Sequence, residues 1–345
     1  MMASFVLIIL IIATIVTGNE FSNIDDAEVD RPLKKTKQKM RPSSFPKERN
    51  NESLTTQNKS NMVTQLWKTI GRCPKNIIIT CVGPNFGPCS EWAEESVGHA
   101  TQSKEAHVEH TRRFHGAKAT ISLWKPYVQT LREFSLAQIW LASGTSHETN
   151  TIEAGWQVYK FLYGDYNPRY FIYWTADGYQ YTGCYNLKCP GFVHVSQDFA
   201  IGATVSPVSS VCGAKYQIPT STWRDTRSGH WWLKVYDNIF VGYWPSSLFT
   251  TLKDVATDVH WGGEITNNRD GSQHTTTKMG SGHFAEKASY FKNIEIVDEG
   301  EIMKALVGTS PIMSEENCYN IKPGTDVHWG TYFFFGGPGR NAKCK

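Results

Sequence analysis

Residues 150–159 constrain the fold more than any other stretch, because their side chains alternate in character as those of a strand do. Ile152 and Trp156 fall on one face of such a strand, and Glu153 and Gln157 fall on the other. A carboxylate in a segment that is otherwise half buried is costly unless it is hydrogen-bonded, paired or protonated. The segment therefore predicts a strand whose carboxyl group has a specific role.

A second stretch, residues 260–266, has the same character and carries Glu264. We hypothesise that Glu153 and Glu264 meet in one cleft. Two carboxyl groups in a cleft of low dielectric cannot both ionise cheaply, so one pKa rises and the other falls. Such a pair supplies a general acid and a general base, which can activate water against a carbonyl group or an acetal. The alternative is that each glutamate is structural and is satisfied by backbone N–H groups.

The chain from Gly116 onward is typical of an all-β domain. It is rich in aromatic residues and glycine, with 12 Trp, 15 Tyr, 17 Phe and 28 Gly in the whole sequence, which favours strands and tight turns over helices. Alternating runs at 117–124 and 169–175 are separated by turn residues, and 232–244 is typical of a hairpin. We expect one all-β domain of about 230 residues, an antiparallel β-sandwich of two large packed sheets.

The N-terminal region predicts export, followed by a segment that does not fold alone. Residues 5–16 form an apolar run too short to span a membrane, and small residues follow it, so residues 1–18 are predicted to be a secretory signal peptide. Residues 19–61 are polar, with a basic run at 31–41, and cannot bury enough surface to fold. They are either a pro-segment that lies across the mature domain or a solvated tail.

The connection to the β domain is rich in charge. Residues 91–115 are expected to include a helix, and Arg112-Arg113 is a candidate processing site. Asn51 and Asn58 begin glycosylation sequons. The expected division is a signal peptide at 1–18, a pro-segment at 19–113, and a β-sandwich domain at 114–345.

Export places the cysteines in an oxidising compartment, so disulfides are expected before metal ligands. Cys184 and Cys189 can close a small loop, and Cys318 can join the last strands to Cys344. A zinc site is the alternative for the first pair, because four intervening residues fall within ligand spacing. Among Cys73, Cys81 and Cys89 a local disulfide can form and leave one odd thiol. Cys212 is either free or paired to the N-terminal region.

Charge and motifs exclude several classes of function. The formal net charge is only +3, and no basic stripe interleaved with aromatics follows the N-terminal region, so nucleic acid is not an expected partner. No stretch reaches the length of a membrane span. The sequence lacks a His-Glu-x-x-His motif, and His260, His274 and His283 are scattered around Glu264. We expect ordinary hydrogen-bonded histidines, no metal and no cofactor, with a histidine metal cluster as the alternative.

Seven short motifs resemble, in the same order, those of the neprosin family of secreted plant proteins. They lie at residues 151–158, 173–180, 182–189, 242–245, 262–265, 279–284 and 336–341. The resemblance covers roughly residues 116–345. Upstream, residues 40–46 and 66–74 resemble the activation peptide of the family, which favours the pro-segment over the solvated tail.

The resemblance implies a glutamic endopeptidase, active in acid, in which two glutamates activate water. The catalytic motifs of the family are matched at Glu153 and Glu264. The resemblance also implies a zymogen, cleavage after proline in peptides or proteins, and inhibition by the chain's own pro-segment. A secreted plant glycoprotein of this kind is expected in the apoplast or the vacuole.

Further expectations concern the surroundings of the glutamates. Gln157, Trp174 and Tyr179 adjoin the strongest motifs and are expected to contact substrate. The resemblance implies two disulfides, Cys184–Cys189 and Cys318–Cys344. His260-Trp261 departs from the usual pair of the family, which affects substrate choice more than catalysis.

Two other classes of function remain open from the sequence. A glycosidase also needs two carboxylates. A non-catalytic cell-wall or carbohydrate-binding sandwich would use the glutamates structurally.

Overall fold

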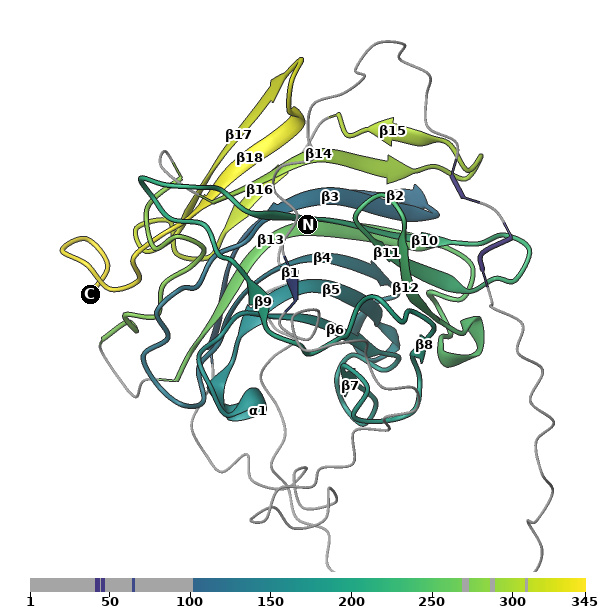
Figure 1. The fold of residues 1–345 in the computed structure, drawn as a ribbon, viewed down its shortest axis with the longest axis horizontal. Helices are drawn as coiled ribbons and strands as arrows, with labels where there is room; N and C mark the ends of the chain where they lie inside the picture. Colours follow the sequence, from purple (N-terminus) through teal and green to yellow (C-terminus); the bar gives the residue numbers. More distant parts are fainter. Residues whose placement is uncertain are drawn as a thin grey trace, which may run out of the picture. The chain divides into compact units, whose positions relative to one another are not determined.

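Strands are the main regular element of the described chain, and most of them belong to two large sheets (Figure 1). The nine-stranded sheet contains, in spatial order, β17 (Asn320–Asp326), β18 (Gly330–Gly336), β14 (Ser289–Val297), β3 (Gly116–Ser122), β10 (Gln217–Arg224), β11 (Trp231–Val235), β12 (Ile239–Trp244) and β8 (Val193–His194), with β15 (Met303–Ala305) beside β14. The seven-stranded sheet contains β16 (Ser310–Met313), β2 (Gln102–Phe114), β13 (Ala256–Asn267), β4 (Ser135–Ser143), β5 (Asn150–Val158), β6 (Arg169–Thr175) and β7 (Cys184–Tyr185). Its neighbouring strands are all antiparallel.

The structure is a computed structural model that describes residues 41–43, 45–46, 64–65, 102–268, 273–285, 289–307 and 310–345. The description concerns the compact unit Pro42–Lys345. The predicted signal peptide lies outside the described residues, as do the following predicted positions: Asn51, Asn58, Cys73, Cys81 and Cys89. Within the described ranges, no helix has the length and apolar character that a membrane span requires.

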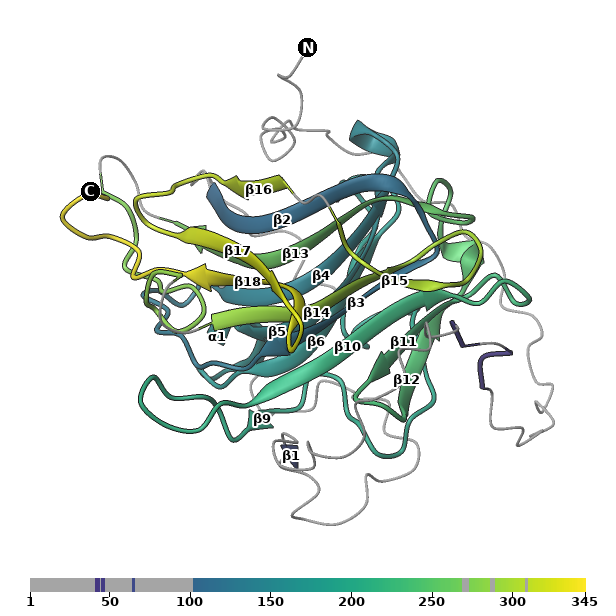
Figure 2. The ribbon, with the colours of Figure 1, turned by 90° about the horizontal axis from the view of Figure 1, so that it is seen from above.

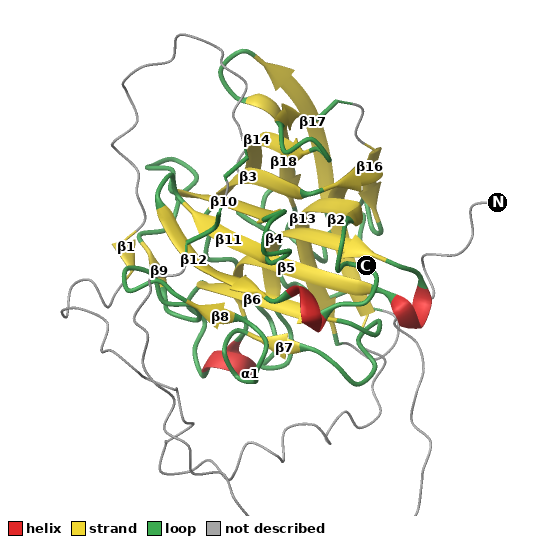
Figure 3. Ribbon diagram, turned by 90° about the vertical axis from the view of Figure 1, so that its right-hand side faces the viewer, coloured by secondary structure: helices red, strands yellow, loops and turns green. Residues whose placement is uncertain are grey.

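Helices are short and few in the described part of the chain (Figure 3). They comprise α1 (Lys160–Tyr163) and single 3₁₀ turns at Ser146–Glu148 and Ser246–Leu248. A separate strand pair joins β1 (Thr64–Gln65) to β9 (Val205–Ser206). The expected all-β fold of two large antiparallel sheets is therefore confirmed.

The core lies between the two sheets, whose strands overlap when the molecule is seen from above (Figure 2). On β5, Ile152, Ala154 and Trp156 are buried in this core, and Nε1 of Trp156 donates a 2.8 Å hydrogen bond to the carbonyl oxygen of Ser122 in the other sheet. Burial of each large apolar side chain stabilises the fold by roughly 1.5–3 kcal/mol. Because side chains alternate along a strand, Glu153 points to the opposite face, away from the core. The alternation predicted for β5 is confirmed.

Strand β2 differs from the sequence-based expectation. It occupies residues that the sequence grouped with the pro-segment, and it replaces the helix expected within 91–115. It pairs with β13 along nearly its whole length, so residues 112–113 lie inside a strand. Ala106 and Val108 face the core, whereas the positions between them carry His and Glu. Those outward polar residues made a buried strand resemble a charged connector.

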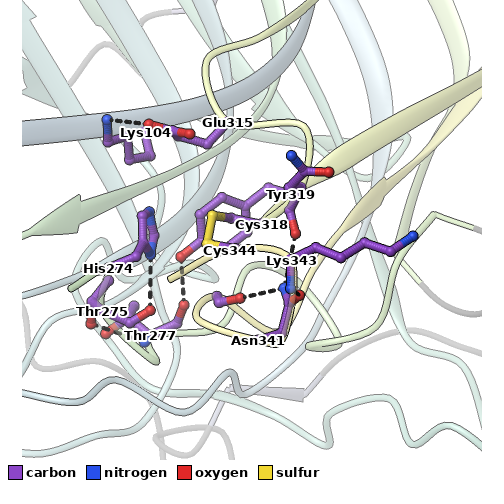
Figure 4. The surroundings of a disulfide bond; sticks show 12 residues. Lys104, His274, Thr275, Thr277, Glu315, Cys318, Tyr319, Asn341, Lys343 and Cys344 are labelled. Atoms are coloured by element: carbon purple, nitrogen blue, oxygen red, sulfur yellow. Dashed lines mark hydrogen bonds and ion pairs between the residues drawn. A yellow bond between two sulfur atoms is a disulfide. The ribbon is translucent and has the colours of Figure 1, made fainter. Parts of the chain in front are cut away.

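Both expected disulfides are present, Cys184–Cys189 and Cys318–Cys344. The second joins the segment before β17 to the C-terminus, and Figure 4 shows Tyr319 beside it. The hydroxyl of Tyr319 donates a 2.7 Å hydrogen bond to the carbonyl oxygen of Thr277, which ties this corner to the segment after β13. Cys212 is exposed and forms no disulfide with a described residue.

A short upstream segment packs on the nine-stranded sheet. The hydroxyl of Ser43 donates to the Asp225 carboxylate. The ring of Phe45 packs edge-to-face on Trp223 at 5.0 Å between centroids, and the ammonium of Lys234 lies 3.6 Å from the centre of that ring. This apolar cluster is separate from the main core. The segment therefore covers the face of the nine-stranded sheet that points away from the core.

Candidate active site

Glu153 and Glu264 come from the two strands that flank β4. Glu153 on β5 lies opposite Trp140 of β4, and Glu264 on β13 lies opposite Leu136 of β4. Trp140, Gln138 and Leu136 alternate along β4, so they share one face. Both glutamates therefore point to the same outward face of the seven-stranded sheet. Gln138 of β4 lies between them on that face.

Gln138 is flanked by glycines on both neighbouring strands. At this level of the sheet it is therefore the only residue of β13, β4 and β5 with a side chain. It lies opposite Gly155 on β5 and opposite Gly262 on β13. A Cβ at Gly155 would lie 2.0 Å from the carbonyl oxygen of Ala137, and one at Gly262 would lie 2.4 Å from Cβ of His107. Glycine is thus required at both positions, and the surface between the two glutamates stays open around Gln138.

Glu153 is enclosed, with 7% of its surface exposed. Its Oε1 accepts hydrogen bonds from the hydroxyl of Tyr179 at 2.8 Å and from that of Thr151 at 3.1 Å. The side chain of Gln138 also bonds to it. Burial raises the pKa of Glu153 from 4.5 to about 7, although these hydrogen bonds favour the ionised form and act in the opposite direction.

Glu264 is half-buried, and its Oε1 accepts a 2.7 Å hydrogen bond from the hydroxyl of Ser103. Glu105 lies directly opposite on β2. Burial raises the pKa of Glu264, and the negative charges of Glu105 and Glu153 raise it further. We expected one pKa of the pair to rise and the other to fall. Both rise instead, because both carboxyl groups are withdrawn from water.

Three tyrosines gather on the Glu153 side of this face. Tyr173 lies opposite Glu153 on β6, and its ring meets that of Tyr185 at 4.6 Å and that of Tyr179 at 5.9 Å. The backbone of Tyr179 is left-handed, with φ of 68°, and its N–H donates a 3.1 Å hydrogen bond to the hydroxyl of Thr175. Such a conformation costs free energy in a non-glycine residue, and here it directs the hydroxyl at Glu153.

The structure brings only some of the predicted contact residues to this face. Tyr179 contacts the first glutamate, as described above. Gln157 shares the outward face, but its amide donates a 2.9 Å hydrogen bond to the hydroxyl of Tyr163. Trp174 lies on the other face, in the main core, edge-to-face with Phe249. Trp174 was expected at the site because it is next to the strongest motifs in sequence. Strand alternation, however, directs its side chain to the face opposite that of Tyr173.

Sequence reasoning missed Gln138, Ser103 and Glu105. Gln138 interrupts the apolar run of β4, which is the same signal that identified Glu153. The other two lie on β2, which the sequence placed outside the domain. Recognising β2 as a strand would have predicted both.

Two groups of described residues carry donor atoms suited to a metal ion. His274 lies beside the sulfurs of Cys318 and its partner, which are joined in a disulfide and therefore do not act as thiolate ligands. The second group comprises His107, Glu109 and His260 on the outward face. Burial, and then the neighbouring His107, lower the pKa of His260 to about 3, so this imidazole is neutral over most of the acid range.

Fold and site together define a class: two-sheet antiparallel sandwiches with a pair of enclosed glutamates on one outward sheet face. The chain matches the Neprosin family model over residues 131–338, which is more than half of its length. The protein belongs to the neprosin family.

Solved structures similar to this chain are peptidases by their descriptions. Scytalido-glutamic peptidase with a peptide-based transition-state analogue is 12% identical, with a TM-score of 0.36, over 69% of this chain and 99% of that one. SCP-B, of the Eqolisin family, in complex with the tripeptide Ala-Ile-His, is 12% identical, with a TM-score of 0.34, over 70% of this chain and 100% of that one. Likenesses at this level carry no conclusion about the chemistry of this chain.

Proposed function

We propose that this protein is a glutamic endopeptidase in which Glu153 and Glu264 activate water for peptide hydrolysis. The observation that carries the proposal is the pair of enclosed carboxyl groups on one open sheet face, each with a raised pKa and each held by a hydroxyl donor. At a pH between the two pKa values one carboxyl group is ionised and the other is protonated, which is what general acid–base catalysis needs.

In the proposed mechanism, Glu153 is the base and Glu264 is the acid. Three hydrogen bonds favour ionised Glu153, whereas the like charge of Glu105 opposite Glu264 favours the protonated form there. Ionised Glu153 takes a proton from water as the oxygen attacks the peptide carbonyl carbon. Protonated Glu264 hydrogen-bonds to the carbonyl oxygen and then donates its proton to the leaving nitrogen as the C–N bond breaks. Transfer of a proton from Glu153 to Glu264 restores the starting state.

The proposed substrates are peptides that contain proline, cleaved on the carboxyl side of that residue. The family resemblance motivates this preference. The flat rings of Tyr173, Tyr179 and Tyr185 support it, because they offer an apolar surface beside Glu153 on which a pyrrolidine ring can pack.

We also propose that the chain is secreted and made as a zymogen. The contacts of Ser43 and Phe45 support this, because they tether the upstream region to the sandwich. They lie on the nine-stranded sheet, and Glu153 lies on the seven-stranded sheet. The two disulfides support an oxidising compartment such as the apoplast or the vacuole.

A peptide-library digest tests this function. We expect processed protein, digested at several pH values from about 4 to 8, to cleave after proline, fastest where Glu153 is ionised and Glu264 is still protonated. The intact precursor should cleave far more slowly. Mass spectrometry identifies the cut sites, and a parallel incubation with cell-wall glycans tests the glycosidase alternative. Sugar release without peptide cleavage, or inertness of protein whose processing has been verified, would overturn the proposal.

Tyr179→Phe is expected to lower kcat/KM by about 10–100-fold, the equivalent of one hydrogen bond to a charged group. Loss of the hydroxyl that bonds to Glu153 also removes an interaction that lowers the pKa of that carboxyl group. The acid limb of the pH–rate profile should therefore move to higher pH. Tyr181→Phe is the matched control, because Tyr181 is in the same turn and is 93% exposed. An unchanged profile for Tyr179→Phe would show that the hydroxyl does not act on Glu153.

A further inference from the structure

Two histidines from neighbouring strands, one buried and one half-buried, face each other on the outward sheet face. His107 lies on β2 and His260 on β13, and their ring centroids are 4.7 Å apart. His107 lies opposite Gly262 in the strand register. The missing side chain at Gly262 is what allows this approach, since a Cβ there would lie 2.4 Å from Cβ of His107.

Each histidine has a ring nitrogen that forms no hydrogen bond with a described residue. Nδ1 of His107 lies 3.1 Å from Oε2 of Glu105, which favours the tautomer with the proton on Nδ1. Nε2 of His107 then carries a lone pair, and it is buried without a hydrogen bond. Nδ1 of His260 is also buried without a hydrogen bond. Two such atoms side by side indicate a ligand between them, because buried polar atoms are rarely left unpaired.

Glu109 adds a third donor to the two imidazoles. Its Oε2 lies 3.9 Å from Nδ1 of His260, opposite it in the strand register. One ligand atom each from His107, Glu109 and His260 lies within 4.8 Å of the others. Tetrahedral zinc with bonds of 2.0–2.1 Å places its ligand atoms about 3.3 Å apart, so small side-chain rotations close the set.

We propose that His107, Glu109 and His260 form a binding site for a zinc ion, with Glu105 orienting His107. Two imidazoles and one carboxylate are a donor set that zinc takes with one open position. A carboxylate on the second ring nitrogen of a ligating histidine is the usual support for such a site. Magnesium and calcium prefer oxygen ligands and do not match it.

The open position has a counterpart in the structure. His107, His260 and Glu264 line a cavity of about 10 Å³, which is about the room that one water-sized ligand occupies. The ion would therefore lie beside the proposed acid without being part of the hydrolytic step. The zinc site rests on the arrangement of His107, Glu109 and His260 and stands whether or not the chain hydrolyses peptides.

Titration calorimetry of the full chain with zinc chloride at neutral pH tests the site, because the imidazoles must be unprotonated to bind. We expect one ion per chain, and His107→Gln and His260→Gln should each weaken binding by more than about tenfold. His283→Gln is the matched control, because His283 is exposed and outside the cluster. It should bind zinc as the wild-type chain does.

Cobalt supplies a test that needs no variant. We expect cobalt added to the wild-type chain to give the intense visible absorption of a four-coordinate ion, and added zinc should abolish it.

Circular dichroism of the histidine variants shows whether they remain folded. Absence of binding by the wild-type chain would overturn the site. So would binding that survives in both folded histidine variants, because the ion would then lie elsewhere, for example at the exposed Cys212 thiol. Substrate is absent from both measurements, so their outcome is independent of the proposed peptidase activity.

Discussion

Replacing Glu153 with Gln is expected to lower kcat/KM for peptide hydrolysis by about 10³-fold or more, since general acid–base catalysis contributes about 10²–10⁴-fold. Gln keeps the shape of the side chain and can still accept hydrogen bonds from Tyr179 and Thr151. It cannot take a proton from water. Glu264→Gln should have a loss of similar size, because its amide cannot donate and recover a proton in the same way.

The two losses should not add in the double variant, because the glutamates act as a unit. Glu316→Gln is the matched control, since Glu316 is exposed and distant in sequence from both strands. Its kcat/KM should equal that of the wild-type protein. Full activity in either single variant, with folding confirmed by circular dichroism, would rule out the two-glutamate mechanism.

The second large effect is on stability and concerns the pH dependence of unfolding. The pKa of Glu153 is about 7 in the folded protein and near 4.5 when the chain is unfolded. The folded state therefore holds a proton that the unfolded state releases between these values, so stability falls as pH rises through this window. At 1.36 kcal/mol per pH unit, the loss for this group is about 3 kcal/mol.

Glu153→Gln carries no ionisable group at this position and should lack that loss. Urea unfolding of both proteins at several pH values between about 4 and 8 measures it. The free energy of unfolding of the variant, relative to that of the wild-type protein, should therefore increase by about 3 kcal/mol as pH rises through this window. Glu264 titrates in both proteins, so the difference reports Glu153 and its effect on Glu264. Parallel stability curves would show that Glu153 is not a buried acid with a raised pKa.

The sequence predicted those features whose physical cause is local. The alternation in β5 determines which side chains face the core, and it correctly placed Glu153 on the opposite face. Cysteine spacing and the family motifs identified Cys184–Cys189 and Cys318–Cys344. Each of these depends on residues close together in the chain or on a motif that is itself contiguous.

The failures arose where a strand is polar on its outward face. β2 places Glu105 and His107 between inward apolar residues, so its composition resembled that of an exposed connector. Only pairing with β13 shows that those polar side chains lie on the face shared with Glu264. The expected substrate contact of Trp174 differs for a related reason. Trp174 follows Tyr173 in the motif, but alternation along β6 turns its side chain into the core.

The sequence by itself determined the all-β class and the two disulfides, and it proposed Glu153 and Glu264 as the candidate pair. Tertiary structure alone decided what surrounds those glutamates. Register across β13, β4 and β5 set Gln138 between two glycines, and pairing of β2 with β13 set His107 against His260. The physical reason is that alternation is a property of one strand, whereas a site on a sheet is made from side chains on several strands. Their register follows from the packing of the whole sandwich.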